Sequence, residues 1–517
     1  MGRRRDPRAK IERGDFQTPP ALAASVCRVL AGHGLAPRSI VEPTCGTGSL
    51  LGAALDAFPA FEHALGIELD PDHVAAARAA LGARIAVPGA RVTVELGDLF
   101  TAEWPARLTA LPDPLLVIGN PPWVTSADLG ALQSDNLPAK ANFHGRKGLD
   151  AVTGKSNFDI SEWMVLKLLA WLDGRDAVLA MLCKVSVARK VLAFSWRADA
   201  MIRAAAMYRI DAMAHFGAAV EACLLVCELG PHGGSQACHL FDDLEPARAT
   251  GVLGYRDGAL VSDLAKYDRW KGLQGESAYH WRSGIKHDCA AVMELRRTDD
   301  GFENGDGEPV ALEDQWLYPL CKSSDVARGG AMTAQRYLVV PQRQIGEDTH
   351  QLQQSAPRTW RYLMHHRARF DRRASTIYRG KPPFSIFGIG EYSFAPWKVA
   401  ISGLYKKLAF RVIGPHRGKP VMFDDTCYFL ACGSEAEAHL LAALLASEPA
   451  TQFYESLVFW DAKRPITAEL LRRLDLHRLA QTLGRATELA EVTSATASAA
   501  RPPSSAAARA SRPARTG

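Results

Sequence analysis

Four consecutive residues, Asn120-Pro121-Pro122-Trp123, carry the groups of this chain that are best suited to chemistry. They follow the apolar run Leu115–Gly119, which is typical of a buried β-strand. Because proline cannot continue a strand, the backbone after Asn120 is stiff and extended. The segment presents an amide oxygen, a backbone carbonyl and an aromatic ring. Two acceptors beside a flat apolar surface suit a planar heterocycle that carries an exocyclic amino group. An ordinary strand-to-loop turn is the alternative interpretation.

Strand-like and helix-like segments alternate before this motif. Strands are predicted over Ser39–Glu42, Ala64–Leu69, Arg91–Leu96 and Leu115–Asn120. The first is followed by a glycine turn, Pro43–Gly48, and then by a helical stretch. This alternation predicts an α/β fold with a parallel, doubly wound sheet and a site at the carboxyl edge of its strands.

Acidic side chains stand near the tips of the second and third predicted strands. Glu68 lies 20 residues after Gly48, where an acid meets ribose hydroxyls in nucleotide-binding folds. Asp98 lies just beyond the third strand. Downstream, two helices and three strands are predicted, the last two strands as an antiparallel pair: helices Phe158–Leu172 and Val187–Ala206, and strands Ala177–Cys183, Arg209–Phe216 and Ala222–Leu229.

The composition of the 517 residues, 47% apolar and 23% charged, is that of an ordinary globular protein. No apolar run approaches the ~18 residues that a membrane span requires. The ten cysteines form no C-x-x-C pair, which argues against a zinc ribbon or a disulfide framework and favours the cytoplasm. We expect no metal site, because His365-His366 and Asp424-Asp425 match no ligand pattern.

Positive charge is concentrated in residues 356–420. This segment, the basic region, holds 14 Lys and Arg against two acids, while the whole chain carries a net charge of only +5. Its basic residues alternate with aromatic ones, as on a surface that tracks phosphates and contacts bases. A solvated face over an aromatic core is the alternative. The region is therefore a candidate nucleic-acid surface.

Taken in order, the motifs resemble those of the γ-class adenine-N6 DNA methyltransferases of restriction–modification systems. They span about the first 230 residues, and their order is far more specific than any one of them. The motifs are Phe16-Gln17-Thr18-Pro19-Pro20, Glu42-Pro43-Thr44-Cys45-Gly46-Thr47-Gly48, Gly66-Ile67-Glu68-Leu69-Asp70-Pro71, Gly97-Asp98-Leu99-Phe100 and Asn120-Pro121-Pro122-Trp123. Ser156–Trp163, Ser385–Gly390 and Lys398–Gly403 also look like segments of this group.

The resemblance implies S-adenosylmethionine as cofactor, bound by four of these motifs. Thr18 and Pro19 would line its methionine end. The glycine turn would hold the amino acid moiety through Glu42, Cys45, Gly46 and Gly48. Glu68 would accept hydrogen bonds from the ribose hydroxyls. Asp98, with the Leu99 backbone beside it, would accept one from the adenine amino group.

The resemblance also implies roles for the catalytic positions. Asn120 and the Pro121 carbonyl would accept the hydrogens of the target amino group, and Pro122 helps to stiffen the turn. Trp123 replaces the commoner tyrosine; it keeps the stacking face but lacks the phenol. Phe216 resembles the second aromatic residue, which packs against the extruded base. A core phenylalanine at a strand end is the alternative for Phe216.

The predicted organisation is a Rossmann-like catalytic domain followed by an α+β target-recognition domain. The expected parts are a disordered basic arm (1–13), a catalytic domain (14–232), a recognition domain (235–480) and a disordered Ala/Ser/Pro/Arg tail (488–517). Within the catalytic domain, the polar segment Thr125–Lys155 is positioned to close over DNA.

The implied reaction is methyl transfer from S-adenosylmethionine to the adenine amino group of a flipped base in duplex DNA. The resemblance also leaves room for a separate restriction endonuclease as a partner. Three alternatives remain open: adenine methylation of RNA, methylation of protein glutamine, and an inactive DNA-binding protein. Cytosine-C5 methylation is excluded, because it needs a nucleophilic cysteine, usually after proline, and the chain has no Pro-Cys pair.

Overall fold

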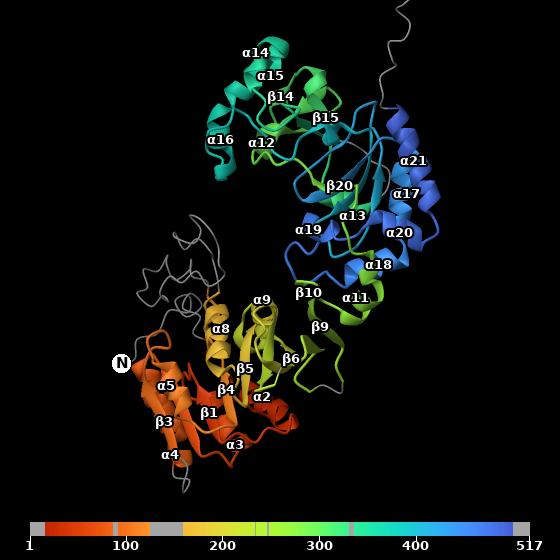
Figure 1. Ribbon diagram of the computed structural model, residues 1–517. Helices are drawn as coiled ribbons and strands as arrows, with labels where there is room; N and C mark the ends of the chain where they lie inside the picture. The colour runs from red at the N-terminus through yellow and green to blue at the C-terminus, as the bar shows by residue number, and fades with distance from the viewer. Residues whose placement is uncertain are drawn as a thin grey trace, which may run out of the picture. The chain divides into compact units, whose positions relative to one another are not determined.

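The computed structural model describes residues 16–85, 91–124, 159–232, 234–245, 248–329 and 335–499. The chain divides into two compact units, Met1–Leu264 and Ala265–Gly517 (Figure 1). The predicted arm (1–13) and the predicted closing segment Thr125–Lys155 lie outside the described residues. None of the described helices is both long and apolar enough to cross a membrane.

A ten-stranded sheet forms the centre of the first unit, in the order β10-β9-β8-β6-β7-β5-β4-β1-β2-β3. Strands β1 to β5 are parallel, and β7 pairs antiparallel with both β5 and β6. The strands are β1 (Ser39–Glu42), β2 (His63–Glu68), β3 (Arg91–Leu96), β4 (Leu115–Gly119), β5 (Ala177–Lys184), β6 (Ile202–Ile210), β7 (Ala222–Leu229), β8 (Ala237–Phe241), β9 (Gly251–Arg256) and β10 (Ala259–Val261).

Strands β8 to β10 place the end of the first unit later than predicted. The sequence suggests a boundary at residues 232–235, after a Gly- and Pro-rich stretch. In the structure β8 pairs with β6, and β9 and β10 continue the same sheet as far as Val261. The hydrogen bonds of these edge strands therefore make residues 237–261 part of the first unit.

Helices cover both faces of this sheet because side chains of successive strand residues alternate between two cores. Ile40 packs with α2, α3 and α4, whereas Val41 packs with α5, α8 and α9. Figure 1 shows α8 and α9 beside β5. The helices are α2 (Pro20–Gly32), α3 (Ser49–Ala57), α4 (Pro71–Ile85), α5 (Trp104–Thr109), α8 (Ile160–Leu172), α9 (Val185–Arg197) and α10 (Ala212–Phe216).

The segment between β5 and β7 differs from the prediction. The expected helix Val187–Ala206 ends at Arg197, and strand β6 begins at Ile202. The expected strand Arg209–Phe216 contains only the end of β6, followed by the short helix α10. Asp211 starts this helix, because its carboxylate accepts a hydrogen bond from the Ala214 amide at 2.9 Å. The spacing of apolar residues in the sequence does not show where β6 ends and α10 begins.

The order of the strands defines where a ligand site is expected. The chain adds β2 and β3 on one side of β1 and then returns to place β4 on the other side. Val41 of β1 lies opposite Val117 of β4, so the carboxyl ends of these strands are neighbours. In doubly wound sheets, ligands bind at this reversal of strand order. Glu42 and Asn120 stand at these two strand ends.

The second unit contains two smaller sheets, β11-β20-β17-β18 and β14-β13-β12-β16-β15-β19. Their strands are β11 (Arg282–Ser283), β12 (Glu294–Thr298), β13 (Gly301–Glu303), β14 (Pro309–Val310), β15 (Leu317–Cys321), β16 (Arg336–Val339), β17 (Trp397–Ser402), β18 (Arg411–Ile413), β19 (Met422–Phe423) and β20 (Cys427–Cys432).

Short helices accompany these sheets. They are α11 (Leu264–Trp270), α12 (Ala290–Met293), α13 (Ser323–Arg328), α14 (Leu352–Ser355), α15 (Pro357–His365), α16 (Arg367–Asp371), α17 (Glu435–Leu445), α18 (Glu448–Glu455), α19 (Ala468–Leu471), α20 (Leu476–Thr482) and α21 (Ala486–Ala499). Residues 488–499 of the predicted disordered tail thus belong to α21, and residues 500–517 lie outside the described residues.

Candidate active site

The Asn120 side chain has a fixed orientation. Its Nδ2 donates to the Phe16 carbonyl at 2.9 Å and to Thr18 Oγ1 at 3.3 Å. Because a carbonyl can only accept, the amide nitrogen must face Phe16. Asn120 Oδ1 is buried and has no hydrogen-bond partner among the described residues. Leaving such an acceptor unpaired costs about 1–3 kcal/mol, so this oxygen is poised for a donor.

Three aromatic rings surround this end of β4. Trp123 contacts Phe216 edge-on with ring centroids 5.1 Å apart, and Phe16 lies about 6 Å from both, at 6.1 and 5.9 Å. The Trp123 indole N–H donates to the Leu182 carbonyl of β5 at 3.2 Å. Only 6% of Trp123 is exposed. The structure thus brings Trp123 and Phe216 together, with the indole buried between Phe216 and Phe16.

Lys184, the last residue of β5, ties down the backbone of the same motif. Its ammonium group donates to the Trp123 carbonyl at 3.0 Å and pairs with Asp159 at 2.7 Å. Asp159 also begins α8, because its carboxylate accepts from the Ser161 amide and hydroxyl. One cation therefore joins the ends of β4 and β5 to the start of a helix.

The glycine turn after β1 is closed by side chains from two other motifs. Glu68 Oε2 accepts from the Gly46 amide at 2.8 Å, and Gln17 Oε1 accepts from the Thr47 amide at 3.0 Å. Gly46 has φ +51°, and a Cβ there would lie 2.3 Å from Gln17 Oε1. Gly48 also has positive φ, at +82°. Both conformations favour glycine over other residues.

Glu42 and Cys45 are buried, although the resemblance implies that they contact the cofactor directly. Glu42 is only 2% exposed, and its Oε2 accepts from the Leu51 amide at 2.8 Å. Burial raises the pKa of the Glu42 carboxyl well above its ordinary value. The Cys45 thiol is also buried, and burial raises its pKa too. These two side chains form the buried side of the glycine turn.

The acids at the end of β2 and just after β3 lie beside exposed apolar side chains. Besides the Gly46 amide, Glu68 accepts from the Asp70 amide at 2.9 Å, and Asp98 Oδ1 accepts from the Phe100 amide at 2.9 Å. Leu69 and Leu96 are 51% and 60% exposed. Leu99 is buried, and its carbonyl accepts from the Trp104 indole. This edge offers carboxylate acceptors next to an apolar surface.

The sequence motifs predict the main positions of this site but not their partners. Thr18 meets Asn120, whereas Pro19 precedes α2, and Pro121 is buried beside Trp123. Phe16 and Gln17 belong to the first motif but received no role from the sequence. Lys184 was missed altogether, because a single lysine at a strand end carries no sequence signal.

The basic region lies in the second unit, and the structure separates its residues by exposure. Nine of the 14 basic side chains are exposed: Arg358, Arg361, Arg367, Arg372, Arg379, Lys381, Lys406, Lys407 and Arg417. Lys398 is buried and donates to the Ala395 and Val421 carbonyls. Of the aromatic residues, Phe370 and Phe384 belong to the core. Part of the predicted surface is therefore structural.

A cavity of about 740 Å³ also lies in the second unit. Charged side chains of both signs line it, and some of them are already paired. Arg336, for example, pairs with Asp325 at 2.6 Å. The cavity therefore contains no obvious catalytic arrangement.

The residues at the carboxyl edge of the first sheet fit S-adenosylmethionine. Carboxylates of Glu68 and Asp98 keep free lone pairs for hydroxyl and amino donors, since each carboxylate offers about four acceptor sites. Leu69 and Leu96 offer an apolar surface for a purine ring. The positive φ angles of Gly46 and Gly48 bring backbone close to the site.

Comparisons with known proteins agree with this assignment. No protein-family model matches the sequence. The chain is 44% identical over 477 residues to the type II methyltransferase M.NspV of a Nostoc species. The aligned region covers 92% of this chain and 98% of that protein.

One solved structure agrees at the level of fold. The type IIL restriction–modification enzyme MmeI, solved in complex with DNA, matches with a TM-score of 0.52 at 12% identity; the match covers 88% of this chain but 64% of MmeI. A type I restriction–modification methyltransferase subunit from Streptococcus thermophilus matches 44% of this chain and 47% of its own, with a TM-score of 0.31 and 16% identity.

These findings confirm the predicted restriction–modification family, the Rossmann-like fold class with a C-terminal domain, and S-adenosylmethionine as the cofactor. An identity of 44% across nearly the full length of both proteins is decisive for the family. The chain belongs to the type II DNA methyltransferases of restriction–modification systems.

Proposed function

We propose that this enzyme methylates the N6 amino group of adenine in duplex DNA, and that it acts on a base flipped out of the helix. The observation that carries the proposal is the buried, unpaired Oδ1 of Asn120, whose direction is set by Phe16 and Thr18. An acceptor with this orientation suits an amino group. The likeness to M.NspV, a type II methyltransferase, and to MmeI, a restriction–modification enzyme solved in complex with DNA, supports DNA as the substrate.

The adenine amino group needs help because its nitrogen lone pair is delocalised into the ring. In our proposal Asn120 Oδ1 and the Pro121 carbonyl each accept one amino hydrogen. This favours a pyramidal nitrogen whose lone pair is directed at the methyl group for in-line attack. S-adenosylmethionine would supply the methyl group and leave as the neutral thioether S-adenosylhomocysteine, and the methylated nitrogen would release one hydrogen as a proton to water. The protein therefore contributes mainly positioning and electrostatic stabilisation.

The other motif residues hold the cofactor in this proposal. Glu68 accepts from the ribose hydroxyls, and Asp98 accepts from the adenine amino group, next to the Leu99 backbone. Thr18 and Pro19 border the methionine end of S-adenosylmethionine. The turn from Cys45 to Gly48 lies alongside its amino acid moiety. Glu42 acts from beneath this turn, since it is buried and holds the Leu51 amide.

A flipped base requires the aromatic cluster to open. Extrusion from the duplex costs a few kcal/mol, and stacking on an aromatic ring offsets about 1–3 kcal/mol of it. Trp123 is covered by Phe16 and Phe216 in the structure. We infer that Phe16 or Phe216 moves aside when the base enters. Trp123 stays in place, because its indole N–H and its carbonyl are both hydrogen-bonded.

The second unit is proposed to recognise the DNA target. Its nine exposed basic side chains in residues 356–420 suit contacts with phosphates. The first unit, including β8 to β10, then serves as the catalytic domain. A separate restriction endonuclease is the expected partner in such a system.

The test replaces Asn120 with Ala and measures methyl transfer to duplex DNA, with mass spectrometry of the nucleosides produced. We expect turnover to fall by about 10²–10³, the loss typical of one preorganised polar contact. Binding of S-adenosylmethionine and DNA should persist. The fold should also persist, because the prolines and Lys184 hold the turn.

Thermal unfolding of the same preparation is the control, since a merely structural asparagine would lower turnover only in proportion to lost stability. A stable Asn120→Ala protein with near-normal transfer would contradict the proposal. N4-methylcytosine as the product of the wild-type enzyme would contradict the choice of base. Methylation of RNA or of protein glutamine, with duplex DNA unmodified, would favour the alternative substrates.

A further inference from the structure

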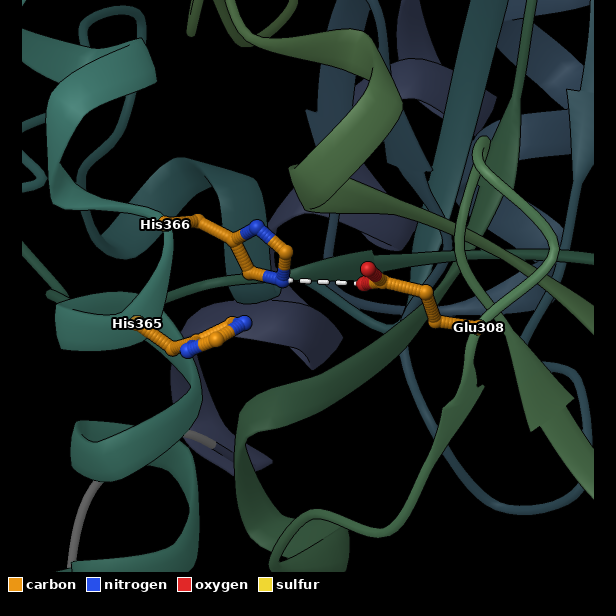
Figure 2. Close-up of side chains that lie close together, drawn as sticks. All are labelled: Glu308, His365 and His366. Carbon is orange, nitrogen blue, oxygen red and sulfur yellow. Dashed lines mark ion pairs between the residues drawn. The ribbon is translucent and has the colours of Figure 1, made fainter.

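We propose that Glu308, His365 and His366 of the second unit form a binding site for a divalent transition metal of the Zn²⁺ class. Each residue offers one ligand atom, and these atoms all lie within 4.8 Å of one another. Glu308 stands in the turn between β13 and β14, whereas the histidines stand where α15 ends and α16 begins (Figure 2). The site thus joins two segments that are nearly 60 residues apart in sequence.

The most informative group is the imidazole of His366, which is only 7% exposed. Its Nε2 lies 3.1 Å from Glu308 Oε2, as the dashed line in Figure 2 marks. The distance is that of an ion pair, yet the nitrogen makes no hydrogen bond of acceptable geometry with any described residue. A short distance without a favourable angle does not make a hydrogen bond. A buried nitrogen that lies close to a carboxylate without a hydrogen bond is the arrangement that a bridging cation would satisfy.

The surrounding charges are compatible with a neutral imidazole ligand. Burial lowers the pKa of His366 below its ordinary value, while Glu308 and Asp306 oppose this shift and His365 and Arg369 reinforce it. Arg369 is itself paired with Asp306 at 2.6 Å. A neutral histidine is the form that binds a metal.

The carboxylate of Glu308 is already held by a neighbouring side chain. The buried Asn304 donates through Nδ2 to Glu308 Oε2 at 2.6 Å. Its Oδ1 accepts from the amides of Asp306 and Glu308, both at 3.0 Å. Ligands of metal sites are commonly oriented by such second hydrogen bonds. The turn is therefore organised around Glu308.

The ligand set indicates the kind of metal. Two imidazole nitrogens and one carboxylate suit Zn²⁺ and related ions, whereas Ca²⁺ and Mg²⁺ prefer oxygen ligands alone. This proposal departs from our expectation that His365-His366 forms no metal site. Adjacent residues of a regular helix point in different directions, but the helix ends here and the two rings lie with centroids 4.9 Å apart.

The inferred role is structural. A metal at this position would fix the α15–α16 junction to the β13–β14 turn. These helices carry Arg358, Arg361 and Arg367, three of the exposed cations proposed to face DNA. The site itself does not depend on the proposed adenine chemistry, so its test does not involve methyl transfer.

The experiment titrates metal-stripped full-length protein with Zn²⁺ by calorimetry and with Co²⁺ by visible absorption, which reports coordination geometry. We expect one strong site per chain, and at least a tenfold loss of affinity in both Glu308→Gln and His365→Gln. His350→Gln is the matched control. His350 is exposed, as His365 is; it pairs with Asp348 at 2.7 Å and lies outside the cluster. This variant should bind as the wild type does.

Thermal unfolding with and without Zn²⁺ distinguishes the loss of a metal ligand from the loss of the fold. Zn²⁺ should raise the unfolding temperature of the wild type and of His350→Gln, but not that of Glu308→Gln. Equal affinity in the wild type and the two cluster variants would overturn the proposal. So would the absence of a strong wild-type site, because Glu308 and His366 would then form an ion pair only.

Discussion

Glu42 shows how burial changes a residue that sequence motifs mark as important. The carboxyl is almost fully enclosed, its Oε2 accepts from the Leu51 amide, and its pKa is raised well above normal by desolvation. A carboxyl with a raised folded-state pKa contributes stability that is complete below the unfolded pKa of about 4.3. That stability is lost as pH rises toward the folded pKa, because the folded protein then holds a proton that the unfolded chain has released.

We therefore expect Glu42→Gln, which keeps an acceptor for Leu51 but cannot ionise, to gain stability relative to wild type as pH rises from 5. The gain should be at most about 1.4 kcal/mol per pH unit. Denaturant unfolding at several pH values, without cofactor, measures it. A difference between the two proteins that does not change with pH would show that Glu42 ionises normally.

At the scale of elements, Lys184 connects β4, β5 and α8 through the Trp123 carbonyl and Asp159. Lys184→Met should free the backbone after Asn120 while leaving the glycine turn intact. We expect the turnover number to fall at least tenfold, the effect of about 1.4 kcal/mol in the barrier, with little change in affinity for S-adenosylmethionine. Lys184→Arg should restore part of the loss. Steady-state kinetics and calorimetry measure the two effects.

Lys190→Met provides the comparison for Lys184, because it also removes an ion pair to α8, with Glu162 at 3.0 Å, but does not touch the motif. Both variants should lose stability, and only Lys184→Met should lose turnover beyond it. Equal turnover losses in the two would indicate that Lys184 acts through stability alone.

At the scale of the whole molecule, the proposed catalytic residues and the basic region lie in different units. The proposed DNA surface includes Arg361 and Arg372, which are exposed and donate to carbonyls of their own helical segment. If each arginine binds a phosphate, replacing both with Ala should weaken DNA binding. The slope of log affinity against log salt should then become shallower by about 1 for each arginine replaced.

Arg296→Ala is the corresponding control, since Arg296 is equally exposed in the second unit but lies outside the basic region and pairs with Glu303. Its salt dependence should match that of the wild type. An unchanged slope in the Arg361 and Arg372 variant would place the DNA surface elsewhere.

The amino-acid sequence by itself determines the features that depend on near neighbours. Strands β1, β3 and β7 have the predicted limits, because short runs of strand-forming residues bounded by turn residues define a strand locally. Local residues likewise determine the two turns: prolines end β4, and glycines form the turn after β1. The order of the motifs was enough to predict the family, the fold class and the cofactor.

The tertiary structure decides what depends on residues that are distant in sequence. Asn120 receives its orientation from Phe16, 104 residues earlier, and the Trp123 carbonyl is held by Lys184, 61 residues later. The unit boundary moves to residue 264 because edge strands add to a sheet already formed. Residues 202–210 become a strand because β7 pairs with them. Hydrogen bonding and burial across such separations leave no local pattern in the sequence, and only the folded chain defines them.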